Sequence, residues 1–291
     1  MKDYRKISSL FKSQPTVEGA GVHLKRAFGY HQVPLLDPFL LLDDFHSSNP
    51  EDYMAGFPSH PHRGIETVTY MLHGSVKHKD SIGNSGVIQD GDLQWMTAGS
   101  GIIHSEMPQK QKGVLRGFQL WVNLPASHKM MPPRYREVKQ KQIPEILFDN
   151  GVKIKILSGE ADGTKGPVRD IAVDCTYLDV AVPVNAEFEY RVRSDDTVFA
   201  YVIDGTGYFD ADQKQQADED HLVLFTAGDH IKIIAGDRSV RFLLVSGKPI
   251  KEPVAWYGPI VMNTREELQI AFEDYQKGTF IKGKAPRAPN P

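Results

Sequence analysis

An internal repeat constrains this chain more than any other feature of its sequence. Met71-Leu-His-Gly74 matches Val202-Ile-Asp-Gly205, and 93–99 (Leu-Gln-Trp-Met-Thr-Ala-Gly) matches 222–228 (Leu-Val-Leu-Phe-Thr-Ala-Gly). The two matched pieces occur in the same order, at an offset of about 130 residues, which favours duplication of one structural unit. The 291 residues are also enough for two domains.

The strand pattern predicts an all-β fold. Segments such as 66–73 and 198–203 are rich in β-branched and aromatic residues, and each ends at a glycine turn. Their close spacing is typical of sandwiches or barrels. Further short strands are expected at 117–123, 152–157, 177–182, 222–225, 230–234 and 240–245.

One helix is expected near the end of the chain. Thr264 and Glu267 resemble a capping box, apolar residues follow at helical spacing, and Gly278 would end the helix. Residues after 281 are expected to form a loose tail. A polar, proline-containing stretch predicts domains at 1–133 and 143–291, joined by a linker at 134–142.

Composition excludes several classes of protein. The net charge of −3 supplies no positive field for nucleic acid, and no apolar stretch is long enough to span a membrane. The single Cys175 excludes an intramolecular disulfide and a cysteine metal cluster. We therefore expect a soluble, cytoplasmic protein, a monomer, with no direct nucleic-acid partner.

Two pairs of side chains predict a metal site. His60 and His62 stand at i and i+2, as do His104 and Glu106, so each pair would point to one face of a strand. Glycines frame both pairs. Glu66 has the same parity as His62 and could replace Glu106 as a ligand or support the site from outside it, and parity alone does not choose between them.

The two copies differ at these positions. His60 and His62 align with Arg191 and Arg193, while His104 and Glu106 align with Ile233 and Ala235. We therefore expect one metal ion per chain, held in the N-terminal half. Three imidazoles and one carboxylate favour Fe(II), although Mn, Ni, Co, Cu or Zn could bind the same set.

At these residues the chain resembles the pirin family of the cupin superfamily. The resemblance spans nearly the whole chain, and five strings carry it: 40–45, 60–70, 91–106, 119–125 and 252–263. It implies two cupin barrels of the double-stranded β-helix (jelly-roll) type, placed face to face, with a C-terminal helix. It also implies one metal, typically iron, in the N-terminal barrel, while the C-terminal cupin lacks metal ligands.

The resemblance identifies the ligands as His60, His62, His104 and Glu106, and so favours Glu106 over Glu66. It implies quercetin 2,3-dioxygenase activity, in which a flavonol ring is opened with O₂ and carbon monoxide leaves. Glu106 is then the expected catalytic base, with Glu66 in reserve.

The alternative implied by the family is an iron-dependent, redox-sensing regulator that acts through a protein partner. Arg63, Lys77 and Lys79 could form its binding surface. His73 and His78 flank a glycine turn and could line the mouth of a pocket, but we expect them to be exposed or to serve packing.

Overall fold

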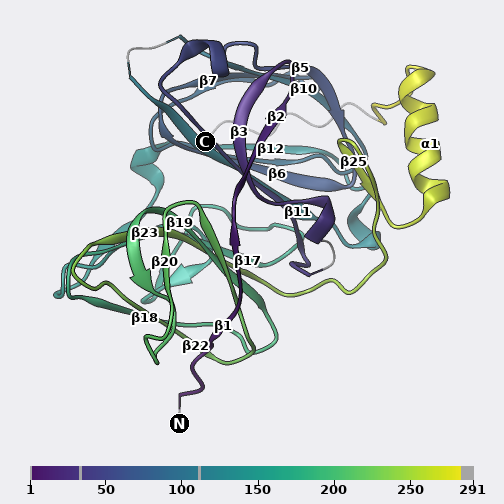
Figure 1. The fold of residues 1–291 in the computed structure, drawn as a ribbon. Coiled ribbons are helices and arrows are strands. Elements are labelled where there is room, and N and C mark those ends of the chain that lie inside the picture. The colour runs from purple at the N-terminus through teal and green to yellow at the C-terminus, as the bar shows by residue number, and fades with distance from the viewer. Residues whose placement is uncertain (1, 33–34, 111–112, 283–291) are drawn as a thin grey trace. The chain divides into compact units, whose positions relative to one another are not determined.

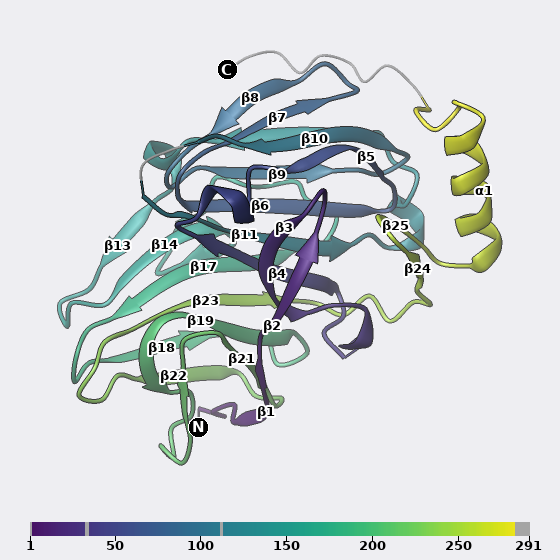
Figure 2. The same ribbon diagram turned by 45° about the horizontal axis from the view of Figure 1, so that its top comes forward.

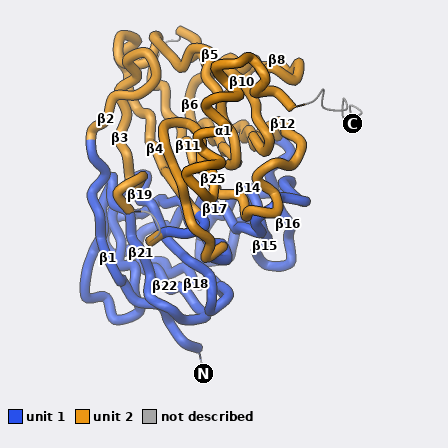
Figure 3. The backbone as a smooth tube through the Cα atoms, turned by 90° about the vertical axis from the view of Figure 1, so that its right-hand side faces the viewer, with its two compact units in different colours: residues 1–14, 36–38, 141–249 blue, residues 15–35, 39–140, 250–291 orange. Residues whose placement is uncertain are grey.

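The chain folds into two compact units, described from a computed structural model that covers residues 2–32, 35–110 and 113–282. Unit 1 comprises residues 1–14, 36–38 and 141–249, and unit 2 comprises residues 15–35, 39–140 and 250–291 (Figure 3). Each unit thus collects segments from distant parts of the sequence, unlike the expected division into 1–133 and 143–291. Within the described ranges, no helix is long and apolar enough to cross a membrane.

Unit 2 contains two main antiparallel sheets. The larger has the order β12-β9-β6-β11-β4-β3-β2, and the smaller has the order β5-β10-β7-β8 (Figure 2). β7 alternates buried and exposed side chains, as a strand with one wet face should. The strands are β2 (Gln14–Glu18), β3 (Val22–Phe28), β4 (Phe39–Ser47), β5 (Phe57–His62), β6 (Ile65–His73), β7 (Val76–Asp80), β8 (Ser85–Ile88), β9 (Leu93–Thr97), β10 (Ile102–Pro108), β11 (Leu115–Asn123), β12 (Arg134–Val138), β24 (Ala255–Tyr257) and β25 (Ile260–Met262).

Unit 1 is built around a 10-stranded antiparallel sheet, whose main path is β1-β21-β19-β23-β17-β14-β13. The N-terminal strand β1 pairs with β21, so the start of the chain belongs to this unit. Its strands are β1 (Ile7–Lys12), β13 (Glu145–Leu147), β14 (Lys153–Ser158), β15 (Glu160–Ala161), β16 (Thr164–Lys165), β17 (Cys175–Val182), β18 (Glu187–Arg191), β19 (Thr197–Tyr208), β20 (Gln216–Asp218), β21 (His221–Phe225), β22 (His230–Ile234) and β23 (Val240–Gly247).

The predicted helix is confirmed as α1 (Arg265–Gln276), which lies beside β24 and β25 in unit 2 (Figure 2; the whole fold is drawn in Figure 1). The Thr264 hydroxyl accepts from the Glu267 backbone N–H, and the Glu267 carboxylate accepts from the Thr264 backbone N–H, which completes the capping box. The predicted tail begins at Lys282, and its residues 283–291 lie outside the described residues. The remaining helices are short 3₁₀ turns: η1 (Tyr30–Gln32), η2 (Pro50–Asp52), η3 (Ala126–His128) and η4 (Gln140–Gln142).

The segment 134–142, expected to be a linker, contains strand β12. This strand pairs with β9 along its whole length, with Arg136 opposite Trp95. Tyr135 and Val138 contribute the apolar side chains of an otherwise charged strand, and Val138 is buried. The high charge of the segment reflects an edge position in the sheet, where charged side chains are common, rather than a lack of structure.

The second copy of the repeat has a hydrophobic interior where the first has imidazoles. β18 pairs with β22 so that Phe188 lies opposite Ile233, much as His60 lies opposite His104 in unit 2. If Ile233 matches His104, then Phe188 rather than Arg191 takes the place of His60. The sequence alignment was shifted here because the loop before β19 differs in length. Phe188, Ile233 and Ala235 all belong to the apolar core of unit 1.

Candidate metal centre

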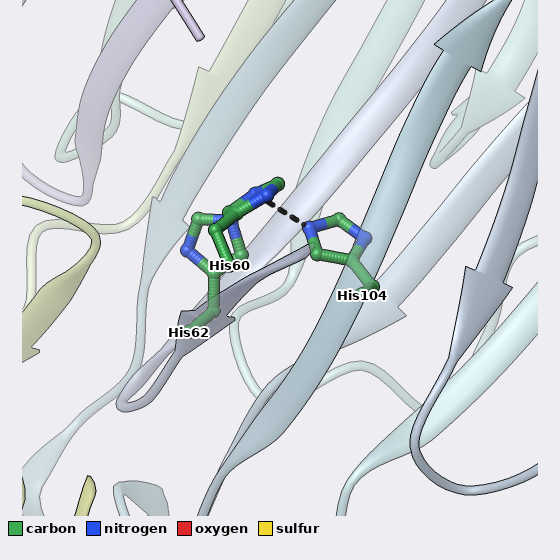
Figure 4. A group of neighbouring side chains, drawn as sticks. All are labelled: His60, His62 and His104. Carbon is green, nitrogen blue, oxygen red and sulfur yellow. Dashed lines mark hydrogen bonds between the residues drawn. The ribbon is translucent and has the colours of Figure 1, made fainter. Parts of the chain in front are cut away.

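Three imidazoles converge on the inner face of the smaller sheet in unit 2. His60 and His62 lie at i and i+2 on β5, and His104 lies on β10 directly opposite His60 (Figure 4). The Nε2 atom of His60 lies 3.1 Å from Nε2 of His62 and 2.9 Å from Nε2 of His104. The predicted spacing therefore brings three ring nitrogens to one point.

The hydrogen bonds of the rings show which nitrogens can bind a metal. His60 Nδ1 lies 2.8 Å from the Pro58 carbonyl oxygen, and His62 Nδ1 lies 3.0 Å from that of Pro259. Because a carbonyl oxygen can only accept, each Nδ1 carries the proton and each neutral ring keeps a lone pair on Nε2. Carbonyl partners of this kind commonly orient histidines that ligate metals.

Burial keeps the inner rings neutral. It lowers the pKa of His62 well below the usual range, and the neighbouring His60 adds to the effect. Burial, together with the other imidazoles, lowers the pKa of His104 in the same direction. The Nε2 atoms of His60 and His62, whose protons are on Nδ1, face each other at 3.1 Å with their lone pairs, an arrangement that is repulsive unless a cation lies between them, so this donor set fits a bound metal ion.

Glu106 lies two residues after His104 on β10, beyond a bulge in the pairing with β5. Its carboxylate is nearly buried, and Oε1 lies 3.3 Å from the Thr69 hydroxyl. The structure places the three imidazoles in one group of possible ligands, and places Glu106 in a second group with His104 and His78. Within each group the ligand atoms lie within 4.8 Å of one another, and His104 is common to both.

His78 is the functional candidate that sequence reasoning missed. It lies on β7 opposite Glu106, and Asp80 lies opposite His104. The ring is fully buried and stacks on Tyr135, with 4.7 Å between the ring centroids. Its Nε2 lies 3.1 Å from Oδ2 of Asp80. The sequence does contain a signal for this residue, because His78 and Asp80 have the same i, i+2 spacing as the pairs His60 and His62, and His104 and Glu106.

A cavity of about 850 Å³ opens beside the histidines within unit 2. Its walls are mainly apolar and aromatic. Trp121 packs edge-on against His62 at 5.1 Å and lies 5.9 Å from Trp256, and both indoles line the cavity. Trp95 and Phe118, in contrast, are core residues with almost no exposed surface.

Comparisons with known proteins agree with this arrangement. The family model described as Pirin matches residues 21–122, and the model described as Pirin C-terminal cupin domain matches residues 177–281. A "Pirin-like protein" of Caulobacter vibrioides is 47% identical over 277 residues, covering 95% of this chain and 99% of that protein. The chain belongs to the pirin family.

Two further relatives carry the name of an enzyme. A protein of Pseudomonas aeruginosa named "Putative quercetin 2,3-dioxygenase" is 40% identical over 284 residues, 96% of this chain and 99% of that protein. The crystal structure of a quercetin 2,3-dioxygenase from Acinetobacter baumannii superposes with a TM-score of 0.88 at 31% identity, covering 95% of this chain and 98% of that one. The predicted pirin resemblance and the two cupin-type domains are thus confirmed.

In this member of the pirin family, Glu66 does not face the histidines. The chain leaves β5 at Gly64 and enters β6 in the larger sheet, so the parity counted from His62 is lost. Gly64 has φ +79°, and a Cβ there would lie 1.9 Å from the Val261 carbonyl oxygen. Glu66 instead accepts from the Thr97 hydroxyl at 2.6 Å, on the face of β6 opposite that of Thr69.

Arg63 cannot contribute to a surface, because it is almost fully buried. Its guanidinium donates to the Ser100 carbonyl, to the Asp274 carboxylate of α1 and to the Phe280 carbonyl, each at 2.8 Å. These hydrogen bonds join α1 and the residues after it to the end of β5, which carries His60 and His62. Lys77 and Lys79 are exposed on β7, as a surface role would require.

Lys129 links the turn between β5 and β6 to the β24–β25 hairpin by hydrogen bonds. Its Nζ donates to the carbonyls of Gly64 at 2.8 Å and Val261 at 2.9 Å, and to the Asn123 side chain at 2.5 Å. Burial lowers the pKa of Lys129 to about 7. Since Pro259, which holds His62, lies in the β24–β25 hairpin with Val261, Lys129 helps to position that ring.

Proposed function

We propose that this chain is a mononuclear metal dioxygenase that opens the ring of quercetin-like flavonols with O₂. Its metal ligands are His60, His62, His104 and Glu106, and iron is the favoured metal. One observation carries the proposal: three Nε2 atoms converge at the wall of a large cavity with aromatic lining. The similarity to proteins named for quercetin 2,3-dioxygenase supports the choice of reaction.

The donor set matches what the chemistry needs. A bound redox-active metal would supply a Lewis acid that also reacts with O₂. Nitrogen and oxygen ligands without thiolate suit Fe(II). His60 and His62 are oriented for this task by the Pro58 and Pro259 carbonyls, so the site is organised before a metal arrives.

The cavity walls would hold a planar substrate against the metal site. Trp121, Trp256 and Phe57 offer flat apolar surfaces that can stack on aromatic rings and exclude water. Holding the enol of a flavonol next to the imidazoles would fix the reacting atoms in one geometry, which lowers the entropic part of the barrier.

Glu106 would act as the base. Its carboxylate lines the cavity and can accept the proton of the flavonol enol, which places electron density in the ring. Both atoms of O₂ enter the ring-opened carboxylic ester, the carbon–carbon bonds on either side of the enol carbon break, that carbon leaves with its own oxygen as carbon monoxide, and no external reductant is needed. The Thr69 hydroxyl, 3.3 Å from Oε1, would keep the carboxylate in place.

The test combines metal analysis with turnover. Protein purified without added metal is analysed for its elements, then loaded with Fe(II) under anaerobic conditions and mixed with quercetin and O₂. We expect about one metal per chain, flavonol-dependent O₂ uptake, and release of carbon monoxide. His60→Ala should lose the metal, Glu106→Gln should lose turnover, and the exposed His73→Ala should retain both.

The outcomes separate the two parts of the proposal. Metal binding without O₂ uptake for any flavonol would refute the dioxygenase and leave a metal centre of the redox-sensing, partner-binding kind. A partner whose affinity changes with the oxidation state of the iron would then be the next measurement. Failure of the chain to bind any metal would refute both.

A further inference from the structure

A row of polar side chains crosses the large sheet of unit 2 at one level. Arg26 on β3 lies opposite Asp43 on β4, and Asp43 lies opposite Gln119 on β11. Gln119 lies opposite Thr69 on β6, and Thr69 lies opposite Gln94 on β9. Directly paired residues point to the same face of a sheet, so all five side chains face the interior of the barrel.

This row forms part of the cavity wall. Arg26, Asp43, Gln119 and Thr69 line the cavity together with Glu106. Four residues two positions away on β3, β4 and β11 are apolar and line the same cavity: Leu24, Leu41, Phe45 and Trp121. The row is therefore a polar strip, apart from the metal centre, in a mainly apolar wall, the pattern by which binding sites orient a ligand.

The row meets the metal centre at Thr69, whose single hydroxyl proton can be donated to Gln119 Oε1 or to Glu106 Oε1. The Thr69 hydroxyl lies 2.6 Å from Gln119 Oε1 and 3.3 Å from Glu106 Oε1. At the far end, the Arg26 guanidinium donates to both Asp43 oxygens at 2.8 Å each and pairs with Glu18 at 2.9 Å. Three interstrand steps separate Arg26 from Thr69, a span of about 14 Å at ~4.8 Å per step.

The strip is rich in acceptors. Two carboxylates, Glu18 and Asp43, share the single guanidinium of Arg26, so this end carries a formal charge of −1. Carboxylates only accept hydrogen bonds, and Asp43 is nearly buried. A ligand that donates hydrogens would be favoured here, whereas an anionic group would meet like charge in a poorly hydrated wall.

We propose that Arg26, Asp43 and Gln119 form a distal subsite for the hydroxyl groups of an uncharged, polyhydroxylated planar ligand. The reacting end of the same ligand would lie at His60, His62 and Glu106. The inference rests on the proposed function, which it extends by assigning the residues that bind the end of the substrate far from the metal. It explains why a polar strip crosses an apolar pocket to the metal centre.

The test measures ligand selectivity without turnover. Fe(II)-loaded protein, freed of excess metal and kept anaerobic, is titrated with quercetin and with 3-hydroxyflavone, which lacks the distal hydroxyls. Quenching of tryptophan fluorescence reports binding, because Trp121 and Trp256 line the cavity. The quantity compared between variants is the ratio of the two dissociation constants.

Asp43→Asn should reduce the wild-type preference for quercetin about tenfold, because a charged acceptor is lost from the subsite. Gln119→Met, which breaks no ion pair, should reduce it about threefold and serves if Asp43→Asn fails to fold. The matched control is Asp179→Asn in unit 1, where Arg241 holds a buried carboxylate in the same two-bond geometry. That variant should keep the wild-type ratio.

An unchanged ratio in both Asp43→Asn and Gln119→Met would overturn the inference, as would equal affinity for quercetin and a derivative sulfonated on the distal ring. Binding that shows the expected selectivity but no O₂ uptake would support the subsite while refuting the dioxygenase. If metal-loaded wild type binds neither flavonol, the subsite and the proposed function both fail.

Discussion

Replacing His78 by glutamine should weaken metal binding without removing a ligand. Asp80 accepts from Nε2 of His78, so the lone pair of the ring is on Nδ1. That Nδ1 and the Nδ1 of His104 are both buried and have no hydrogen-bond partner in the described part of the chain. When His104 binds a metal through Nε2, its Nδ1 must carry a proton, and we expect the Nδ1 of His78, whose ring centroid lies 5.3 Å from that of His104, to become the acceptor.

The expected magnitude follows from these contacts. Loss of an outer partner of a ligating histidine typically weakens metal affinity 10- to 100-fold, or about 1.4 to 2.7 kcal/mol. The stability of the metal-free protein should change less, by about 1 kcal/mol. Asp80 keeps its bonds from the Ile82 and Asn84 backbone N–H groups and the Asn84 side chain, so the turn after β7 persists.

The assay is competition for Co(II) or Fe(II) against a coloured chelator, read beside the d–d spectrum of the Co(II) form. Asp80→Asn should weaken binding in the same direction, since it acts through His78. His73→Gln, on an exposed histidine at the other side of the glycine turn, should leave the affinity unchanged. Affinity of His78→Gln within twofold of wild type would refute the reasoning, and a spectrum showing loss of one nitrogen ligand would make His78 a ligand instead.

Two further predictions concern the groups that hold the site together. Lys129→Met should flatten the rise of unfolding free energy with pH between about 7 and 10. The pKa of Lys129 is lowered to about 7, so over this window the unfolded chain binds the extra proton, and the slope is up to about 1.4 kcal/mol per pH unit. Urea unfolding at several pH values measures this slope, and equal slopes in both proteins would contradict it. Arg63→Met should destabilise the protein by about 3 kcal/mol, because buried carbonyls lose their donor. The exposed Arg238→Met is the control, and a loss no larger than that of the control would show that Arg63 is dispensable.

Local patterns in the sequence were sufficient for several features. The helix α1 follows from a capping box and helical spacing within one short segment. The pairing of His60 with His62 on one face follows from strand parity, which depends only on neighbouring residues. These predictions succeed because the interactions that decide them lie within a few residues.

The sequence did not predict features that depend on where the chain turns or on which strands pair. Glu66 turned away because the chain changes sheets at Gly64, and counting along the chain cannot detect that change. Arg63 was read as a surface cation because its partners, Asp274 and Phe280, lie more than two hundred residues away. His78 became a candidate only once the register of β7 placed it opposite Glu106.

The sequence by itself therefore determined which side chains share a strand face, that the fold is β-rich and duplicated, and that only the first copy carries imidazoles at the ligand positions. The tertiary structure decided which faces meet. It set His60 opposite His104, brought the Pro259 carbonyl to His62, and aligned the polar strip that ends at Glu106. The physical reason is that side-chain direction along a strand is a local property, whereas register between strands is set by the packing of the whole unit.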